Sequence, residues 1–296
     1  MTLWVAQQLI NKGLRVGILS RGYRRRSQER FLLVSDGNRV LVNPSESGDE
    51  PFLMARRCPL AVVAVGADRH GLGEWVLQQQ PVDCFVLDDG FQHLGLQRDV
   101  DLVLIDSSDT QGLEQLLPCG RLREPLNGLT RATTIMLTRY EDGQDVTSLR
   151  GIPEDLKRNR PPVIKSRFVI EGLVMAGNSD CRPATGLSGI PVVIFSGIAN
   201  SSSFRQTVEM LGVEIVDEVV YPDHHAYTQT DLSEIVQRGK EVKAQWFLTT
   251  EKDLVKIEAT WSWPRMLYAV RIGLEVREGV DILEACVQKV LNHSMH

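Results

Sequence analysis

Two adjacent carboxylates, Asp88 and Asp89, directly follow a short apolar run in this sequence. The run, Cys84 to Leu87, is typical of a strand that is buried on both faces of a parallel sheet. Ligands of such sheets bind beyond the carboxyl ends of the strands, so both carboxylates are expected to face a crevice. A pair of like charges there is costly unless it is neutralised, and Mg²⁺ with a phosphate ligand is a common reason for it. The alternative is that one carboxylate caps the next turn and the other is solvated.

Polar clusters follow other predicted strands as well. Clusters at equivalent ends of alternating strands indicate one active-site crevice, and carboxylates with His and Lys fit phosphoryl transfer. His224, beside Asp223, is either an oriented general base or a partner that tunes one. The histidine pair alternatively forms a metal site, or one histidine is simply hydrogen-bonded inside the protein. The further clusters are Ser20-Arg21-Gly22-Tyr23, Ser196-Gly197, Asp223-His224-His225 and Thr249-Thr250-Glu251-Lys252-Asp253.

The strands that would position these clusters alternate with amphipathic helices along the chain. This alternation predicts an α/β fold with a mostly parallel sheet, helices on both faces and right-handed crossovers. Residues 140–165 are rich in charge, Pro and Gly, which predicts a linker near 140–165. We therefore expect an N-terminal lobe at 1–145 and a smaller C-terminal α/β lobe at 146–296.

Composition limits the partners. The 296 residues carry a formal net charge of −5, which gives no global electrostatic case for nucleic acid. Five cysteines without metal-ligand spacing predict reduced thiols of a cytoplasmic protein. No apolar run approaches the roughly 18–20 residues of a membrane span, and no signal peptide is visible. Arginines do cluster locally, at 21–26 and at Arg121 and Arg123, either in solvated loops or at phosphate sites.

Seven short stretches, in this order and spacing, resemble the tetraacyldisaccharide 4′-kinase family, the lipid A 4′-kinases of Gram-negative bacteria. The similarity runs almost from end to end of the chain. Any one tetrapeptide would be weak, but the ordered set is specific. The stretches are Ser20-Arg21-Gly22-Tyr23, Gly48-Asp49-Glu50-Pro51, Asp88-Asp89-Gly90-Phe91-Gln92-His93, the run from Leu117 to Pro125, Phe195-Ser196-Gly197-Ile198, the run from Asp223 to Thr228, and Thr250-Glu251-Lys252-Asp253.

The resemblance implies a P-loop-NTPase-like fold with a second, smaller lobe, and a defined reaction. The family moves the ATP γ-phosphate, with Mg²⁺, onto the 4′-hydroxyl of an acylated glucosamine disaccharide 1-phosphate. The product is lipid IVA, a lipid A precursor. This acceptor implies a protein that sits peripherally at the cytoplasmic face of the inner membrane.

The resemblance also implies roles for single residues. Asp49 would be the general base for the acceptor hydroxyl, with His224 as its partner, and Asp223 would be a further catalytic residue. An alcohol needs a nearby base, and the transferred phosphate needs metal and arginine beside it. The remaining implied roles are Glu50, Asp88 and Asp89 for magnesium; Gln92, His93, Ser20 and Arg21 for ATP; and Arg121, Arg123, His225 and Tyr227 for the acceptor.

One family motif does not occur in the sequence. The family carries a Gly-rich Gly-Lys-Thr phosphate loop, whereas the pair Gly239-Lys240 is followed here by Glu241. In the family this loop precedes the helix that Thr2–Lys12 resembles, so the chain is expected to start just after it. Without these backbone N–H groups and the lysine, the β- and γ-phosphates lose their cradle. We therefore expect little or no kinase activity from the 296 residues alone.

Two rival functions remain open at this point. Asp88-Asp89 and Asp223-His224-His225 also suggest a metal-dependent phosphoesterase, although such sites need more Asp or His ligands at other strand ends. A catalytically deficient homologue that binds acylated sugar or a protein partner is the non-enzymatic alternative.

Overall fold

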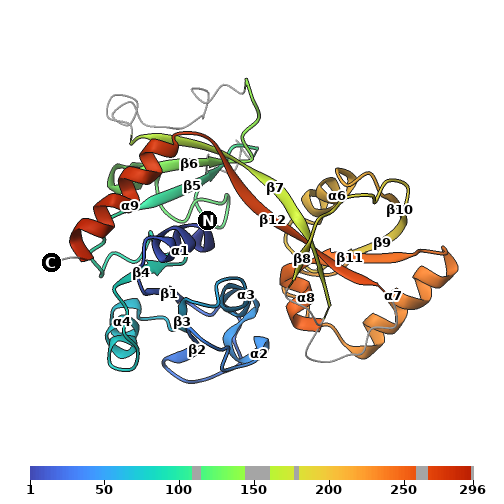
Figure 1. Cartoon of the computed structure of the whole chain (residues 1–296), viewed down its shortest axis with the longest axis horizontal. Helices are drawn as coiled ribbons and strands as arrows, with labels where there is room; N and C mark the ends of the chain where they lie inside the picture. Colours follow the sequence, from blue (N-terminus) through green and yellow to red (C-terminus); the bar gives the residue numbers. More distant parts are fainter. Residues whose placement is uncertain (109–114, 144–160, 177–179, 258–265, 295–296) are drawn as a thin grey trace. The chain divides into compact units, whose positions relative to one another are not determined.

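The chain folds into two α/β units, and each unit is assembled from separate stretches of sequence (Figure 1). Unit 1 combines Met1–Arg21, Leu60–Val169 and Leu274–His296, and unit 2 combines Gly22–Pro59 and Ile170–Gly273. The computed structural model describes residues 1–108, 115–143, 161–176, 180–257 and 266–294.

These units differ from the predicted contiguous lobes 1–145 and 146–296. The predicted boundary near 140–165 does not separate them, because β6 (Thr134–Thr138) and the start of β7 (Val163–Met175) both belong to unit 1 and pair in parallel. Two neighbouring parallel strands need a crossover connection, which accounts for a long polar segment at this place. Residues 144–160 of the predicted linker lie outside the described residues.

Unit 1 contains one set of parallel strands around β1 (Val16–Ser20). β1 pairs with β3 (Val62–Val65) on one side and with β4 (Cys84–Leu87) on the other. Helices α1 (Thr2–Asn11) and α4 (Arg69–Leu77) cover these strands with fully buried apolar side chains. Because β1 and β4 are parallel neighbours, their carboxyl ends bring Ser20 and Asp88 to the same edge of the sheet.

A second set of parallel strands in unit 1 consists of β5 (Leu102–Asp106), β6 and β7. Side chains on β6 alternate between two faces, as expected of a strand with a period of two. Ile135 and Leu137 pack with Leu129 of the 3₁₀ helix η2 (Leu126–Arg131). Met136 packs on the other face with Leu283 of α9 (Val280–Ser294).

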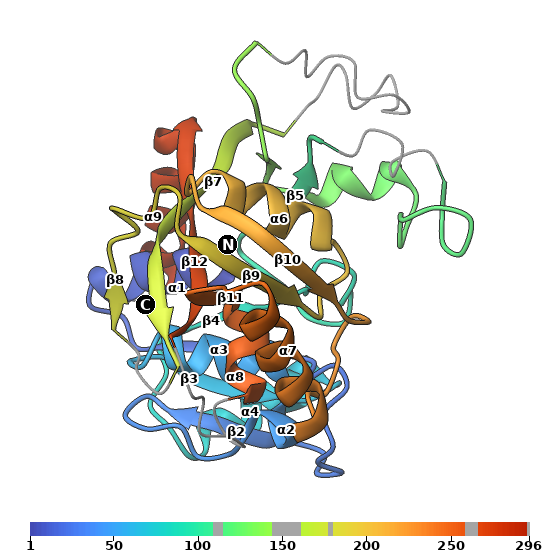
Figure 2. The same cartoon turned by 90° about the vertical axis from the view of Figure 1, so that its right-hand side faces the viewer.

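In unit 2 the parallel strands β10 (Glu214–Val220), β9 (Pro191–Ser196), β11 (Trp246–Thr250) and β12 (Leu267–Glu278) lie side by side in this order. Val193 and Phe195 of β9 face a core formed with α7 (Gln229–Glu241) and α8 (Glu251–Ile257). Val192 and Ile194 face a second core formed with α6 (Ser201–Glu209). The helices therefore cover both faces of these strands, as Figure 1 and Figure 2 show.

Unit 2 also holds β2 (Leu32–Asp36), α2 (Pro44–Ser47), α3 (Asp49–Arg57) and the short strand β8 (Cys181–Arg182), which pairs antiparallel with β7. After β2 the chain turns back, and Ser35 makes an isolated antiparallel bridge with Val40. No helix in the described ranges is long and apolar enough to cross a bilayer.

Candidate active site

In unit 1 the carboxylate of Asp88 is held at the carboxyl end of β4 by two hydroxyl groups. Ser20 Oγ, at the end of β1, donates to Asp88 Oδ2 at 3.0 Å, and Thr2 Oγ1, in the first turn of α1, donates to Oδ1 at 3.0 Å. Hydroxyl donors and a carboxylate at one strand edge give a set of hard oxygen atoms, which is the kind of ligand that Mg²⁺ prefers. The predicted proximity of Ser20 and Asp88 is therefore present.

Asp89 and Gln92 lie beside Asp88 but have different partners. The backbone of Asp89 is in the left-handed region, with φ of 52°. Its exposed carboxylate forms an ion pair with Arg123. Gln92 Nε2 donates to Glu124 Oε1 at 2.9 Å. The two contacts tie the turn after β4 to the loop that carries the predicted phosphate-binding arginines.

Arg69 is a residue of this strand edge that the sequence did not single out. It begins α4, directly after the end of β3, and is 5% exposed. Its Nη1 donates to the Gly66 carbonyl at 2.6 Å. Burial lowers the pKa of Arg69, while the negative charges of Asp88 and Asp89 act in the opposite direction. In the sequence, the only indication of a role for Arg69 was its position after a predicted strand.

A groove of about 1040 Å³ in unit 1 is lined by these polar groups and by apolar side chains. Its polar lining includes Asp88, Asp89, Arg121 and Arg123, and apolar side chains of α1, β4, β5 and α9 line the rest. Such a lining suits a ligand with both a charged and an apolar part.

In unit 2 the predicted base Asp49 and the predicted partner His224 are in contact. His224 Nδ1 lies 3.0 Å from Asp49 Oδ2 and 3.1 Å from Oδ1, and both side chains are at least 90% buried. Asp49 is the first residue of α3, where the helix dipole favours a carboxylate. The preceding Gly48 has φ of 92°, and an added Cβ would lie 2.9 Å from the Tyr23 carbonyl oxygen, so only glycine fits this approach.

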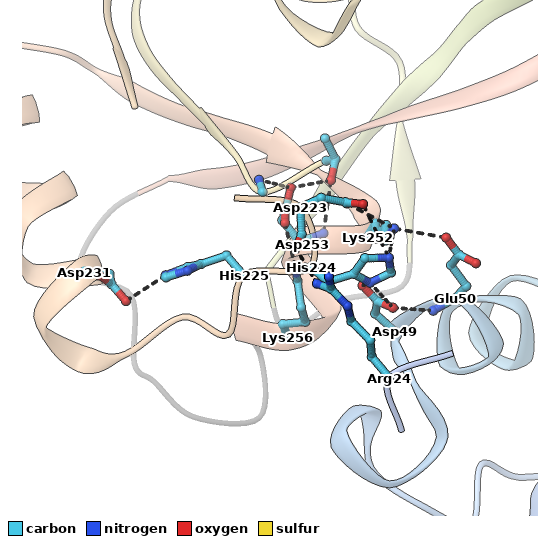
Figure 3. Close-up of polar contacts among 12 residues, drawn as sticks. Arg24, Asp49, Glu50, Asp223, His224, His225, Asp231, Lys252, Asp253 and Lys256 are labelled. Carbon is cyan, nitrogen blue, oxygen red and sulfur yellow. Dashed lines mark hydrogen bonds and ion pairs between the residues drawn. The ribbon is translucent and has the colours of Figure 1, made fainter. Parts of the chain in front are cut away.

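Lys252, the second residue of α8, completes this cluster (Figure 3). Its Nζ lies 3.0 Å from Glu50 Oε1 and 3.1 Å from His224 Nε2. Asp223 Oδ1 is more distant, at 3.7 Å. Burial acts to lower the pKa of Lys252, but the carboxylates of Glu50, Asp49 and Asp223 outweigh it, so the pKa is raised above its ordinary value. Lys252 is thus an ammonium group at neutral pH, and sequence reasoning had given it no role.

A hydrogen bond to the residue after β9 fixes the backbone of His224. Its N–H donates to the Gly197 carbonyl at 3.0 Å, and the Gly197 N–H donates to Asp253 Oδ2 at 3.1 Å. Asp253 is fully buried and also accepts from Thr250 Oγ1 at 2.7 Å. These bonds hold His224 at φ of 61°, a conformation that is uncommon for residues other than glycine.

His225 and Tyr227, predicted to bind the acceptor, have partners inside unit 2. His225 Nε2 lies 3.1 Å from Asp231 Oδ2, and the ring stacks on Tyr221 with centroids 4.4 Å apart. Figure 3 shows His225 directed toward Asp231 and away from Asp49. Tyr227 is 8% exposed and belongs to the core beside Phe195. Their predicted roles stay predictions. In the structure, their contacts stabilise the loop after β10.

The other predicted residues have less defined surroundings. Arg21 and Arg121 are exposed, and the His93 N–H donates to the Gly90 carbonyl at 2.9 Å. Across the described part of the chain, no group of three or more His, Cys, Asp or Glu side chains is arranged to hold a metal ion. Magnesium often binds with one or two carboxylates, waters and substrate phosphates.

Comparison with known proteins decides the family. The model of the family described as "LpxK: Tetraacyldisaccharide-1-P 4'-kinase" matches residues 1–292. The "Tetraacyldisaccharide 4'-kinase" of Anaeromyxobacter dehalogenans (strain 2CP-1 / ATCC BAA-258) is 35% identical over 98% of this chain and 76% of that protein. The chain belongs to the tetraacyldisaccharide-1-P 4′-kinase family.

Further members of this kinase family agree with the assignment. The tetraacyldisaccharide 4′-kinase of Geobacter metallireducens is 32% identical over 98% of this chain and 83% of that protein. The crystal structure of LpxK from Aquifex aeolicus, in complex with ATP, is similar with a TM-score of 0.75 and 29% identity over 98% of this chain and 83% of that chain. The resemblance predicted from the seven motifs and the predicted P-loop-kinase-like α/β fold are confirmed.

Proposed function

We propose that this chain transfers the γ-phosphoryl group of ATP to the 4′-hydroxyl of tetraacyldisaccharide 1-phosphate, giving lipid IVA. The observation that carries the proposal is the buried contact between Asp49 and His224, in a chain that belongs to a kinase family. A buried carboxylate oriented by an imidazole is a suitable proton acceptor for an alcohol.

In this reaction Asp49 accepts the proton of the 4′-hydroxyl. The oxygen then forms the new bond to the γ-phosphorus, the bond to the β–γ bridging oxygen breaks, and ADP leaves. His224 holds both Asp49 oxygens within 3.1 Å of its Nδ1, which limits rotation of the carboxylate. Positioning and charge neutralisation carry most of the catalysis of phosphoryl transfer.

Magnesium-bound ATP fits the oxygen-rich edge of unit 1. Asp88, with the hydroxyls of Ser20 and Thr2, would hold the metal or its bound waters, and Asp89 would assist. The ion would supply neutralisation of the phosphate charge. Arg21, Gln92 and His93 remain proposed neighbours of the nucleotide. The role of Glu50 as a metal ligand stays a prediction. In the structure its carboxylate accepts a hydrogen bond from Lys252.

The groove in unit 1 supports an acceptor with charged and apolar parts. Arg121 and Arg123 are part of its lining, and we propose that they bind the phosphate or sugar of the disaccharide. Because the acceptor carries acyl chains, we propose that the protein works peripherally at the cytoplasmic face of the bacterial inner membrane.

The level of activity is a separate part of the proposal. The sequence contains no Gly-Lys-Thr phosphate loop, whose N–H groups and lysine would cradle the β- and γ-phosphates. We expect the 296 residues alone to turn over at least roughly tenfold more slowly than the relative from Anaeromyxobacter dehalogenans. Equal turnover in a side-by-side assay would contradict this expectation.

The reaction is tested with γ-labelled ATP, Mg²⁺ and tetraacyldisaccharide 1-phosphate in mixed micelles. Label should appear in a disaccharide with two phosphates. Asp49→Asn should lower this residual rate by about 100-fold or more, because general-base catalysis contributes ~10²–10⁴-fold. Asp281→Asn, at an exposed position of α9, is the matched control and should leave the rate unchanged.

The rival functions give different results in the same assay. Release of phosphate from the disaccharide without ATP would indicate a phosphoesterase. Binding of the acylated disaccharide without any binding of ATP would indicate a non-enzymatic homologue. Label transfer that is unaffected by Asp49→Asn would show that another group is the base.

A further inference from the structure

The surroundings of His224 contain one unusual contact: the ring nitrogen Nε2 faces an ammonium group. Lys252 Nζ lies 3.1 Å from Nε2 and 3.0 Å from Glu50 Oε1. The Lys252 side chain is 19% exposed, so Glu50 and His224 provide much of its immediate polar environment. Asp223 Oδ2, the acceptor carboxylate nearest to Nε2, lies 3.7 Å away, which is too far for a hydrogen bond.

Hydrogen-bonding chemistry then determines where the imidazole carries its proton. An ammonium group has three donors and no acceptor, so His224 Nε2 must present its lone pair to Lys252. A neutral imidazole has one N–H, which must therefore be on Nδ1. Nδ1 faces both oxygens of Asp49, which can only accept while ionised.

We propose that Lys252 is a positioning residue that occupies the Nε2 lone pair of His224, whose proton lies on Nδ1, and thereby leaves Asp49 as the proton acceptor. Because Nε2 is bound by Lys252, the imidazole has no free lone pair for an incoming hydroxyl. Asp49 has spare lone pairs, since each carboxylate oxygen offers two. Sequence reasoning left open whether His224 is the base or its partner, and this contact selects the partner. The catalytic part of the proposal rests on the proposed function.

Glu50 has a place in the same arrangement. Its carboxylate accepts from Lys252 Nζ at 3.0 Å, and the two residues are on different helices: Glu50 is on α3, beside Asp49, and Lys252 is on α8. Two neighbouring carboxylates thus contact the His224–Lys252 pair. Asp49 contacts Nδ1 of the histidine, and Glu50 contacts the lysine that binds Nε2.

The tautomer is tested directly by ¹⁵N NMR of histidine-labelled protein at neutral pH. The chain has six histidines, and loss of signals in His224→Gln assigns the relevant ring. The unmodified protein should show a protonated Nδ1 and an unprotonated Nε2 at His224. Asp49 keeps the proton on Nδ1 in every form, so Lys252→Met should shift the ¹⁵N signal of Nε2 toward that of an imidazole nitrogen without a hydrogen bond. Lys252→Arg, which keeps a donor, should retain the signal of the unmodified protein. Lys240→Met, at an exposed position of α7, is the matched control.

Kinetics test the catalytic part. Lys252→Met should lower kcat for transfer to the disaccharide by about 10- to 100-fold, with KM for ATP changed less than about threefold, since a misoriented base costs turnover more than binding. Lys252→Arg should recover most of the loss.

The outcomes separate this proposal from the proposed function. A His224 ring with its proton on Nε2 in the unmodified protein, or an Nε2 signal that Lys252→Met leaves unchanged, would overturn the role of Lys252 whatever the activity. A shifted Nε2 signal with unchanged kcat would overturn its importance for catalysis. Absence of transfer to the disaccharide from all forms would count against the proposed function alone, because the NMR result does not depend on turnover.

Discussion

Asp49 and His224 are 175 positions apart in the sequence, yet their side chains form one buried pair. Periodicity and strand-end arguments do not connect a residue at the start of a helix with one after a distant strand. Only the resemblance of Gly48-Asp49-Glu50 and Asp223-His224-His225 to family motifs brought them together. Lys252 was predicted only as part of a polar strand-end cluster, and Arg69 was missed, because a single lysine or arginine in a helix is ordinarily a surface residue.

The Asp49–His224 contact predicts strongly non-additive substitutions. We expect Asp49→Asn and His224→Gln each to lower kcat, and the double variant to be only slightly slower than the worse single one, since residues that act as a unit are not independent. Single-turnover rates of the four proteins give the coupling. Multiplied losses in the double variant would show that the two side chains act separately.

At the scale of elements, the sequence predicted the strands well because their apolar runs are short and end in polar clusters. The run Cys84 to Leu87, for example, coincides with β4. What it could not predict was the part played by loops: the left-handed conformations at Asp89 and His224 depend on hydrogen bonds to residues elsewhere in the chain. The roles of His225 and Tyr227 have the same difficulty, since their surroundings come from α7 and the core.

The N-terminus of α7 is expected to lose stability in acid. Asp231 accepts from the Thr228 N–H at 2.7 Å and from its hydroxyl at 2.7 Å, and it also contacts His225. Burial acts to raise the pKa of Asp231, but these hydrogen bonds outweigh it and the pKa is lowered. The stabilisation is thus fully present above the ordinary carboxyl pKa and is lost as pH falls through the lowered value.

Hydrogen exchange of the α7 amides, corrected for intrinsic rates, measures this effect between about pH 6 and about pH 3. In the unmodified protein, protection of the α7 amides should decrease as pH is lowered. In Asp231→Asn, protection should be lower at the higher pH and should vary less with pH. Glu234→Gln, on an exposed position of the same helix, serves as control and should behave like the unmodified protein. A pH dependence that survives in Asp231→Asn would assign it to another group.

At the scale of the whole molecule, the sequence predicted two α/β parts but not their composition. A charge-rich segment near 140–165 was read as a boundary, whereas the chain passes between units at Arg21, Pro59, Val169 and Gly273. Two of these passages lie inside the long strands β7 and β12, where no change in composition marks them. A local signal cannot reveal a boundary within a continuous strand.

Unit 1 should depend on the C-terminal helix. Leu283 of α9 is 3% exposed and packs with Met136 and Ile164. Leu283→Ala is expected to destabilise unit 1 by about 2–5 kcal/mol through lost burial and a cavity. Leu77→Ala, on α4 in the same unit, removes a side chain that is 54% exposed and should cost far less. Hydrogen exchange resolved by segment would show the loss in β5 and β6; a loss equal in the two variants would contradict the packing argument.

The contribution of α9 to unit 1 has a consequence for synthesis of the chain on the ribosome. Met136 and Ile164 emerge long before Leu283, so their shared core cannot close until Leu283 has also left the exit tunnel. At ~5–20 residues per second, the apolar strands of unit 1 stay without this partner for several seconds. Nascent chains stalled before α9 should accordingly bind chaperones and remain sensitive to protease at β5 and β6, and chains in which α9 has emerged should lose both properties.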